Sequence, residues 1–353
     1  MDIKKAMIAM SGGVDSSVAA YLMQQAGWDC IGATMRLCDR LVTSESSAAE
    51  DARAVADRLH LPFYVFDHTA LFEKMVVESF IHCYENGGTP NPCVACNRHL
   101  KFDALLKEAL ALGCSHIVTG HYAKVEQAPT SGRYLLKKAA DKAKDQSYFL
   151  ACLSQEQLRH VCFPLGDLTK AQIREIAEAQ GFVTAKKRDS QDICFIPDGD
   201  YRAFMERYTG KTYPSGDYLD LNGNKVGQHR GAVGYTIGQR KGLGLALGAP
   251  VYVCSKDIKR NTVTVGPDEA LYKAALRADN WNWFPFPELT SPIRVLARVR
   301  YRHTEQPATV YPEEKGFARV EFDEPQRAIT AGQSVVLYEG DTVIGGGRIT
   351  EVL

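Results

Sequence analysis

The chain lacks net charge of either sign. Among its 353 residues, 42 lysines and arginines balance 42 aspartates and glutamates, and the pI is about 7.1. Composition therefore gives no indication of nucleic-acid binding, and any such function must rest on local basic patches. No apolar run approaches the ~20 residues of a membrane span, and the apolar stretch at residues 6–10 is too short for the core of a signal peptide. We expect a cytoplasmic protein that does not enter a membrane.

Other motifs are also missing from the sequence, and their absence excludes particular kinds of site and fold. No G-x-x-x-x-G-K-[ST] motif occurs, so a Walker phosphate loop is excluded. Internal repeats and low-complexity tracts are also missing. The ten cysteines do not have the spacing of a small disulfide-rich domain, and in a reducing compartment they are expected to stay free. Most of them are expected to be small core residues, whereas Cys93, Cys96 and Cys194 stand among polar and turn-forming residues.

The order of apolar and polar segments predicts an α/β protein of three parts. Short apolar strands alternate with helical stretches over residues 1–203, which favours an open parallel sheet with helices on both faces. Glycines cluster over residues 204–272, which predicts a small α+β module. Residues 273–353 alternate in the manner of short strands, including 294–302, 308–311, 318–322, 334–338 and 342–349, which predicts a closed β-barrel.

The sequence S-G-G-V-D-S-S at residues 11–17 lies between the first predicted strand and the helix expected over 14–26. Two glycines let the backbone turn closely around an anion, and the unpaired amides of the helix N-terminus would donate to a phosphate. An ordinary glycine-rich turn is the alternative. The loop resembles that of the N-type ATP pyrophosphatases, which release pyrophosphate and leave AMP on the substrate. This resemblance implies ATP, with Mg2+, held by Ala9, Met10, Ser11, Gly12, Gly13, Val14, Asp15, Ser16, Met35 and Gly120.

Two cysteine-containing stretches are the most specific features. In T-P-N-P-C-V-A-C-N-R-H-L-K-F, residues 89–102, the prolines predict an extended loop and Cys96 is expected just before a helix over 102–112. A thiol at a helix N-terminus beside Arg98 and Lys101 should have a lowered pKa. The second stretch is R-D-S-Q-D-I-C-F-I-P, residues 188–197, which contains Cys194.

Together with the phosphate loop, these stretches resemble the tRNA-specific 2-thiouridylases, the MnmA family. The resemblance continues through residues 144–149, 234–240 and 328–333, and so covers essentially the whole chain in order. It implies a sulfurtransferase that activates the 2-carbonyl of the wobble uridine with ATP and exchanges its oxygen for sulfur. By the resemblance, Cys194 carries a persulfide and Cys96 is the nucleophile that releases sulfur, ending as a Cys96–Cys194 disulfide.

The resemblance also implies partners and contacts. The tRNAs would be those for lysine, glutamate and glutamine, and a cysteine desulfurase or persulfide relay protein would supply sulfur. Base flipping is expected, because the reacting carbonyl is stacked in the anticodon loop. Basic runs at residues 137–144 and 186–188, and four arginines alternating over 294–302, could meet phosphates. The implied contacts to tRNA or its target base are Asn91, Pro92, Cys93, His121, Lys144, Asp145, Gln146, Arg300, Tyr301 and Gln333.

One position departs from the family pattern. Many thiouridylases have aspartate where this chain has Cys93, and the resulting C-x-x-C with Cys194 offers three thiolates. These could hold a 4Fe–4S cluster or zinc, or Cys93 could be a bystander.

Two other functions are consistent with parts of the sequence. A synthetase for a small molecule would use the phosphate loop but leave Cys96, Cys194 and the barrel without a task. An RNA-binding or metal-storing protein would need no intact loop. Pyrophosphate exchange that depends on tRNA separates all three.

Overall fold

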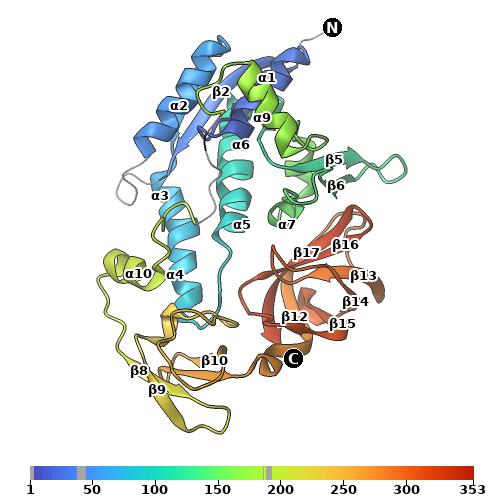
Figure 1. The fold of residues 1–353 in the computed structure, drawn as a ribbon. Helices are drawn as coiled ribbons and strands as arrows, with labels where there is room; N and C mark the ends of the chain where they lie inside the picture. Colours follow the sequence, from blue (N-terminus) through green and yellow to red (C-terminus); the bar gives the residue numbers. More distant parts are fainter. Residues whose placement is uncertain (1–3, 38–44, 186, 188–192) are drawn as a thin grey trace.

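The computed structural model describes residues 4–37, 45–185, 187 and 193–353 (Figure 1). The predicted three-part α/β architecture is confirmed in its main features: an N-terminal parallel sheet covered by helices, a small sheet in the middle of the chain, and a closed barrel at the C-terminus. The exact limits predicted for the three domains stay predictions. Among the helices of the described residues, none is both long and apolar enough to cross a membrane.

The N-terminal sheet has five parallel strands, and its buried residues alternate between its two faces. Ala6 and Ile8 face a core formed with α1, α2 and α9, whereas Met7 and Ala33 face the helix that contains Phe102. The strand order is β3 (Phe63–Asp67), β2 (Asp29–Arg36), β1 (Lys5–Ala9), β4 (His116–Val118) and β7 (Val161–Cys162). The helices are α1 (Val14–Gln25), α2 (Glu45–Arg58), α7 (Ser147–Leu150), α8 (Gln155–Arg159) and α9 (Lys170–Ala179).

Two long helical segments run from this sheet down to the other two parts (Figure 1). The first is built from α3 (Thr69–Phe72), a π-helical turn η1 (Glu73–Val77) and α4 (Glu78–Glu85). The second is built from α5 (Pro92–Cys96), a π-helical segment η2 (Asn97–Ala104) and α6 (Leu105–Ala111). The predictions that the two prolines fix an extended loop and that Cys96 comes just before a helix are therefore wrong. The helix begins ten residues earlier, at Pro92, because proline suits the first helical position and Asn91 accepts a bond from the Val94 N–H.

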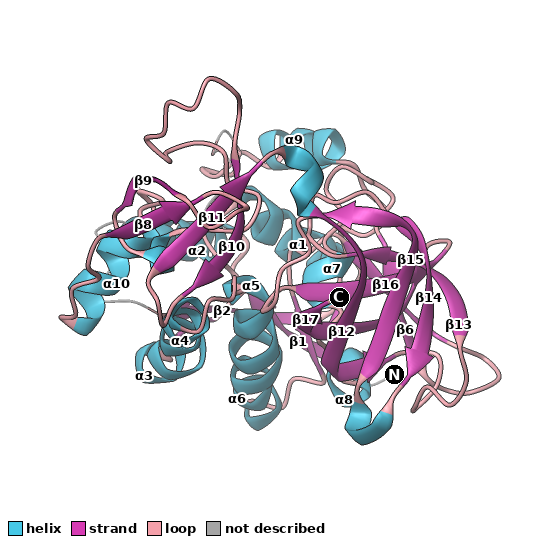
Figure 2. Cartoon of the chain, turned by 90° about the horizontal axis from the view of Figure 1, so that it is seen from below, coloured by secondary structure: helices cyan, strands magenta, loops and turns pink. Residues whose placement is uncertain are grey.

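The middle of the chain forms a four-stranded sheet with the order β10 (Tyr252–Asp257), β11 (Thr262–Gly266), β8 (Gly216–Leu219), β9 (Lys225–His229). One helix, α10 (Tyr201–Thr209), precedes it, and two 3-10 turns accompany it, η3 (Ala232–Gly234) and η4 (Asp268–Leu271). This module and the barrel lie beneath the N-terminal layer in Figure 1, and they are side by side in both ribbon views (Figures 1 and 2).

The barrel closes because β12 pairs with β17 as well as with β15, which leaves its own six strands without a free edge. In order around the barrel they are β12 (Tyr272–Trp283), β15 (Ala318–Arg327), β14 (Gln306–Pro312), β13 (Ile293–Arg298), β16 (Ser334–Glu339) and β17 (Thr342–Val352). The turn η5 (Glu314–Gly316) joins β14 to β15. The strand predicted over 294–302 ends at Arg298, so the expected alternation of four arginines on one face is wrong for Arg300 and Arg302.

The barrel is not separate from the N-terminal layer. A hairpin from the N-terminal part, β5 (Ala123–Gln127) and β6 (Tyr134–Lys138), joins β17 through the pair Thr342↔Lys137. The hydrophobic cluster beneath the parallel sheet also includes barrel residues Phe284, Val336 and Tyr338. The two parts thus share one core, which fixes the barrel relative to the helices that carry the predicted site.

Candidate active site

The phosphate loop folds on itself at the start of α1. The Ser16 hydroxyl accepts from the Ser11 N–H at 3.2 Å and donates to the Gly13 carbonyl at 3.1 Å. Gly13 is the N-cap and has no side-chain capping bond, so no side chain competes for the first amides of α1. These amides lie at the positive end of the helix, where an anion is stabilised. The geometry therefore suits a phosphate group.

Asp15 lies in the first turn of α1, where its negative charge would repel a bound anion if no positive charge balanced it. Its carboxylate accepts from the Tyr122 hydroxyl at 2.7 Å and from the Lys170 ammonium at 2.7 and 2.9 Å. The hydrogen bonds tie α1 to α9 and offset the negative charge. Sequence reasoning missed Lys170, although Thr169 and Gln172 form the capping box that marks the start of its helix.

The residues predicted to bind the nucleotide lie around the start of α1 and at the end of β2. The side chains of Met10, Val14 and Ser16 are buried in the protein, so their main-chain atoms are what they can offer a ligand. Gly120 lies against the start of α1, where a Cβ would come within 2.7 Å of the Ser16 nitrogen. Met35 is half-buried at the end of β2, beside Ala9 on the face covered by η2. The predicted roles of these residues stay predictions.

Gly12 offers a test of the loop. Its φ is +69°, and a Cβ there would meet the Ala48 carbonyl oxygen at 2.2 Å. Gly12→Ala is expected to displace the loop and to lower ATP–pyrophosphate exchange by about 100-fold, since small displacements of binding groups have effects of that size. Gly27→Ala is the matched control, because Gly27 also has a positive φ, +80°, but open space around it. Equal exchange rates in the two variants would contradict a role for the loop.

The three thiols singled out in the sequence come together. Cys93 and Cys96 lie three positions apart in α5, and charge on either thiol adds to the rise that burial causes in the pKa of Cys194. Ile193 and Phe195, on either side of Cys194, belong to the same apolar cluster as Cys96. All three thiols are free. Residues 188–192 of the second predicted stretch lie outside the described residues. The structure thus brings together side chains 98 positions apart in the sequence.

The prediction of a lowered pKa at Cys96 is wrong. Burial raises the pKa of Cys96 and of Cys93, and Lys101 lowers each by a smaller amount. Burial also raises the pKa of Cys194 to about 12, with Cys96 and Cys93 adding to the rise and Lys101 opposing it. Removal of solvent around a thiolate therefore outweighs the nearby cation. Lys101, which follows Cys96 by five residues, is the one cation that acts on all three thiols among the described residues.

His121 is a neutral group in this site. Burial places its pKa well below the usual value, with a further contribution from Lys101, and its Nδ1 lies 2.7 Å from the Thr119 hydroxyl. Its ring contacts Phe102 and Phe163 at centroid distances of 5.7 and 6.0 Å. A neutral imidazole can donate or accept one hydrogen bond but offers no charge to a phosphate.

Cys93, Cys96 and Cys194 were one possible set of ligands for an iron–sulfur cluster or zinc, with Cys93 as a bystander the alternative. Over residues 4–37, 45–185, 187 and 193–353, no group of three or more His, Cys, Asp or Glu side chains is placed to hold a metal ion. The three thiols as arranged therefore do not fit an iron–sulfur cluster or zinc.

Several residues predicted to contact tRNA have partners inside the protein. Arg300 donates to the carbonyls of Ile237 and Ala328 at 3.0 and 2.7 Å. Gln333 donates to the carbonyls of Thr89 and Pro90, both at 3.0 Å. For these two side chains, a tRNA contact stays a prediction and would require an exchange of partners.

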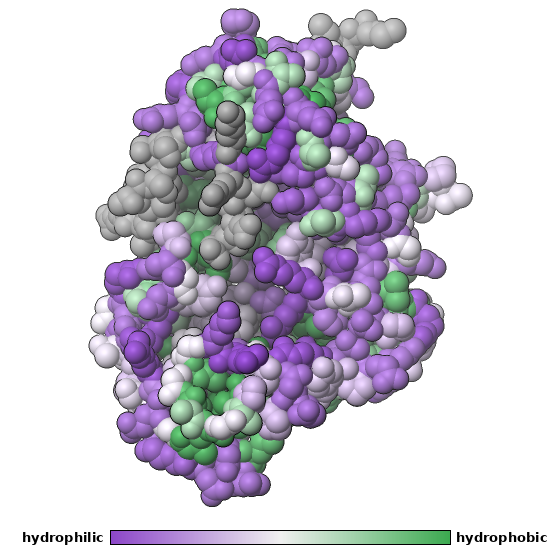
Figure 3. All heavy atoms as spheres, in the orientation of Figure 1, coloured by the Kyte–Doolittle hydropathy of each residue, from purple (hydrophilic) through white to green (hydrophobic). Residues whose placement is uncertain are grey.

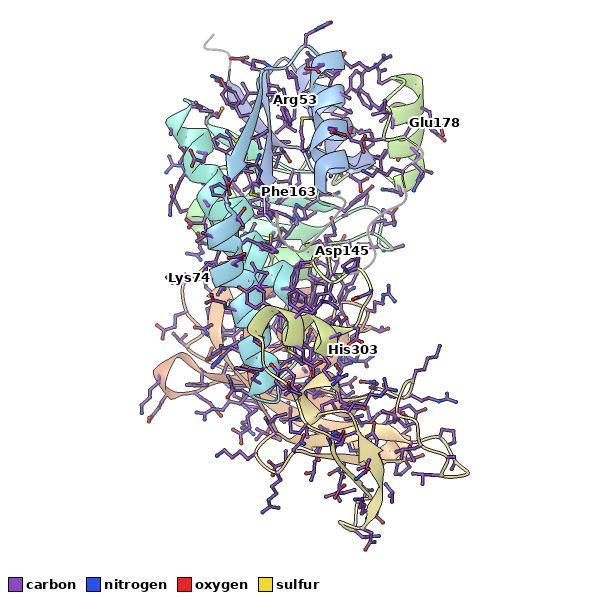
Figure 4. All side chains as sticks on the ribbon, turned by 90° about the vertical axis from the view of Figure 1, so that its left-hand side faces the viewer. Arg53, Lys74, Asp145, Phe163, Glu178 and His303 are labelled. Carbon is purple, nitrogen blue, oxygen red and sulfur yellow. The ribbon has the colours of Figure 1, made fainter. Side chains whose placement is uncertain are left out.

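The predicted contacts in the segment 144–146 lie at the junction with the barrel, where Figure 4 labels Asp145 below Phe163 and above the barrel strands. Asp145 is 3 % exposed, accepts from the Ala139 and Ser147 N–H groups, and faces Arg298 at 3.7 Å. Gln146 accepts from the Tyr122 N–H at 2.9 Å. Lys144 also has a partner. Tyr301 packs its ring 4.4 Å from that of Phe149.

The basic patches are largely paired. Lys137 is bonded to Glu126 and Lys142 to Asp341, while Lys138 is buried against Glu305. Of the run at 186–188, Lys187 alone is described, and it donates to the Gly12 carbonyl at 3.1 Å and to Asp51 at 2.7 Å. Lys187 thus links the segment before Cys194 to the phosphate loop. Figure 3 shows hydrophilic side chains gathered across the middle of this face of the molecule.

Comparison with known proteins gives full-length matches. Residues 4–198 match the family described as tRNA methyl transferase HUP domain, residues 202–267 the tRNA methyl transferase PRC-barrel domain, and residues 273–349 the aminomethyltransferase beta-barrel domain. A tRNA-specific 2-thiouridylase MnmA of Clostridioides difficile (strain 630) is 47 % identical over 357 residues, covering 99 % of both chains. One of Moorella thermoacetica is 49 % identical over 354 residues, covering 98 % of this chain and 99 % of the relative. A solved 4-thiouridine synthetase–RNA complex with bound ATP resembles 55 % of this chain and 45 % of its own, with TM-score 0.39 and 21 % identity.

Proposed function

The chain belongs to the tRNA-specific 2-thiouridylase family, and from this premise we propose that it is an ATP-dependent tRNA sulfurtransferase. Its substrate is the wobble uridine at position 34, and its product is 2-thiouridine. The observation that best supports the proposal is the packing of Ile193 and Phe195, on either side of Cys194, in the apolar cluster that Cys96 also joins, in a chain whose first helix has an N-terminus suited to phosphate. Sulfur transfer needs both a nucleotide-activated oxygen and a pair of thiols.

The first step uses ATP in complex with Mg2+. The 2-oxygen of the uridine attacks the α-phosphorus, the bond to pyrophosphate breaks, and AMP remains on the oxygen. The amides at the start of α1 would hold the phosphates while charge moves onto pyrophosphate. An amide-like carbonyl oxygen is a poor leaving group, and adenylation turns it into a good one.

The second step exchanges oxygen for sulfur with a balanced set of bonds. The terminal sulfur of a Cys194 persulfide attacks carbon 2, AMP leaves, and the base is joined to Cys194 through two sulfur atoms. The Cys96 thiolate then attacks the Sγ of Cys194. A Cys96–Cys194 disulfide forms, the original sulfur–sulfur bond breaks, and its electron pair stays on the sulfur of 2-thiouridine. A dithiol reductant resets the disulfide.

The same proposal includes a sulfur donor and a set of substrate tRNAs. A cysteine desulfurase or a persulfide relay protein places sulfur on Cys194, a residue that reaches the surface although the surrounding protein removes much of the water around its sulfur. The tRNAs are those for lysine, glutamate and glutamine. Asn91, Pro92, Cys93 and His121 are proposed to face the flipped base.

The test is product analysis. The protein is incubated with ATP, Mg2+, a desulfurase with cysteine, and tRNA from cells that lack 2-thiouridine, and the nucleosides are examined by mass spectrometry. We expect 2-thiouridine together with pyrophosphate release that requires tRNA. The descriptions of the matched families name methyl transfer, which releases no pyrophosphate, so a base methylated in a parallel incubation that supplies a methyl donor would overturn the proposal. Pyrophosphate release that requires a small molecule in place of tRNA would overturn it as well.

A further inference from the structure

The loop over residues 86–91, between α4 and α5, lies where the N-terminal layer, the middle module and the barrel meet (Figure 1). The barrel holds this loop through its main chain. The Thr89 N–H donates to the Ala331 carbonyl at 2.9 Å, and the Gln333 amide donates to the Thr89 and Pro90 carbonyls at 3.0 Å each. Both N–H bonds of the Gln333 amide group have an acceptor in this arrangement.

The middle module holds the same loop from its other side. The Lys256 ammonium donates to the Gly88 carbonyl at 3.4 Å and to the Tyr235 carbonyl at 2.7 Å, and it lies 5.4 Å from the centroid of the Tyr84 ring. The loop is thus connected to both parts of the chain that follow the N-terminal layer. Its position depends on how they pack.

The packing around the loop leaves no room for a side chain at two of its glycine contacts. A Cβ on Gly88 would lie 2.7 Å from the Cys83 sulfur, and a Cβ on Gly332 would lie 2.6 Å from that sulfur and 3.0 Å from the Thr89 carbonyl oxygen. The main chains of the loop and of the barrel turn that precedes Gln333 are therefore in direct contact, which small residues permit.

The loop continues directly into the helix that carries two of the thiols. Asn91 caps α5, Pro92 is its first residue and is buried, and Cys93 and Cys96 follow within the next turn. Because a helix is rigid over this length, the position of the loop determines where the Cys96 sulfur lies.

We propose that Gln333 is a positioning residue for sulfur transfer, which acts through the loop at residues 88–91 to place Cys96. This inference rests on the proposed function. It assigns Gln333 a task other than the tRNA contact that the family resemblance implies, and it makes the barrel part of the machinery that orients the nucleophile.

The experiment compares two matched variants. Gln333→Met keeps the length of the side chain but removes both donated bonds. Asn282→Leu is the control, because the Asn282 amide also donates from the barrel to two main-chain carbonyls of the N-terminal part, those of Ala151 and Leu153, at 3.0 and 2.7 Å. Gln333→Glu, which keeps shape and loses the donor, is used if Gln333→Met does not fold.

Three quantities are measured on the full chain: kcat for thiolation, the Kd for tRNA, and the rate of Cys96 alkylation without tRNA, localised by fragmentation mass spectrometry. Gln333→Met is expected to lower kcat by about 10- to 100-fold through misplacement of the nucleophile. Two lost hydrogen bonds should raise the alkylation rate by about 10-fold through more frequent local opening. The Kd should stay within about 2-fold, and Asn282→Leu should change kcat and alkylation by less than about 3-fold, as is common for distant sites.

A weaker Kd with unchanged alkylation would overturn the proposal in favour of a direct tRNA contact, and unchanged values of all three quantities would overturn it too. Equal effects of the two amide variants would show general loosening between the parts, again against the proposal. Gln333→Lys keeps an N–H donor, so its rate of Cys96 alkylation is expected to lie within about 2-fold of the wild-type rate. Failure of the proposed function would appear as absent thiolation in the unaltered chain, whereas the alkylation comparison would still decide the role of Gln333.

Discussion

Replacing Cys96 by serine is expected to lower thiolation by at least about 1000-fold, because a hydroxyl cannot attack the Cys194 sulfur and release the product. The base should then remain joined to Cys194 through two sulfur atoms. In the absence of added thiol, the Cys96→Ser variant should accumulate a covalent protein–tRNA adduct that a reducing agent releases. Gel electrophoresis under denaturing, non-reducing conditions detects it.

The same substitution at Cys194 has a different expected result. Cys194→Ser should also lose thiolation by at least about 1000-fold, but it should form no adduct, because no persulfide can be loaded at that position. Adenylation in both variants, measured as pyrophosphate release with tRNA, should stay within about 3-fold of the unaltered chain.

Two further substitutions test whether the loss of thiolation is specific to Cys96 and Cys194. Cys254→Ser alters a half-buried thiol of β10 whose sulfur contacts the Tyr252 carbonyl, and it should leave thiolation unchanged. Cys93→Ser should lower thiolation far less than Cys96→Ser, since the two-thiol scheme gives Cys93 no bond to make or break and proposes only a contact between Cys93 and the flipped base. Full activity of either Cys96→Ser or Cys194→Ser would rule out the scheme, and loss of activity in Cys93→Ser would require a third thiol in it.

The resting thiol of Cys194 is expected to react slowly at neutral pH. Its pKa is raised to about 12 by burial and by the neighbouring thiols, so the thiol stays protonated and the reactive thiolate forms only as the pH rises. At pH 8 a much smaller fraction of this thiol is ionised than of an ordinary cysteine thiol, so its alkylation should be at least about tenfold slower than that of free cysteine.

The pH profile checks this expectation. The logarithm of the Cys194 alkylation rate should rise with unit slope from pH 7 to pH 10, whereas an ordinary thiol levels off near pH 9. A plateau between pH 8 and pH 9 would contradict it. Lys101→Met removes the cation that lowers the pKa of all three thiols, and it should slow Cys194 alkylation further at each pH. Lys101→Arg keeps the charge and is the matched control.

The fold and the phosphate loop could be predicted because their causes are local. A short apolar strand, two glycines and a helix lie together within residues 5–25, and Gly12 has the positive φ that such a turn requires. The barrel was predictable from alternation along its strands, since one face of each is buried.

The start of α5 was mispredicted although its cause is also local. The two prolines were interpreted as an extended loop, yet Asn91 followed by Pro92 is the pattern of an N-cap and a first helical residue. The error mattered, because it placed Cys96 outside a helix that in fact contains it.

Other features could not be predicted, because they arise only when distant segments pack. The pairing of Asp15 with Lys170 joins positions 155 residues apart. The direction of the pKa shift at Cys96 depends on how much solvent the surrounding protein removes, which residue types nearby do not reveal. The internal partners of Gln333 and Arg300 likewise come from the docking of the barrel against the rest of the chain.

The core shared by the barrel and the parallel sheet bears on how the protein can be divided. A fragment ending before β12 would leave β6 without its neighbour β17 and would uncover the apolar surface that Phe284, Val336 and Tyr338 occupy. Unpaired strand edges beside exposed apolar side chains promote association between chains. Shortened forms of this protein should therefore precipitate when expressed alone, and the two parts should unfold in a single cooperative transition.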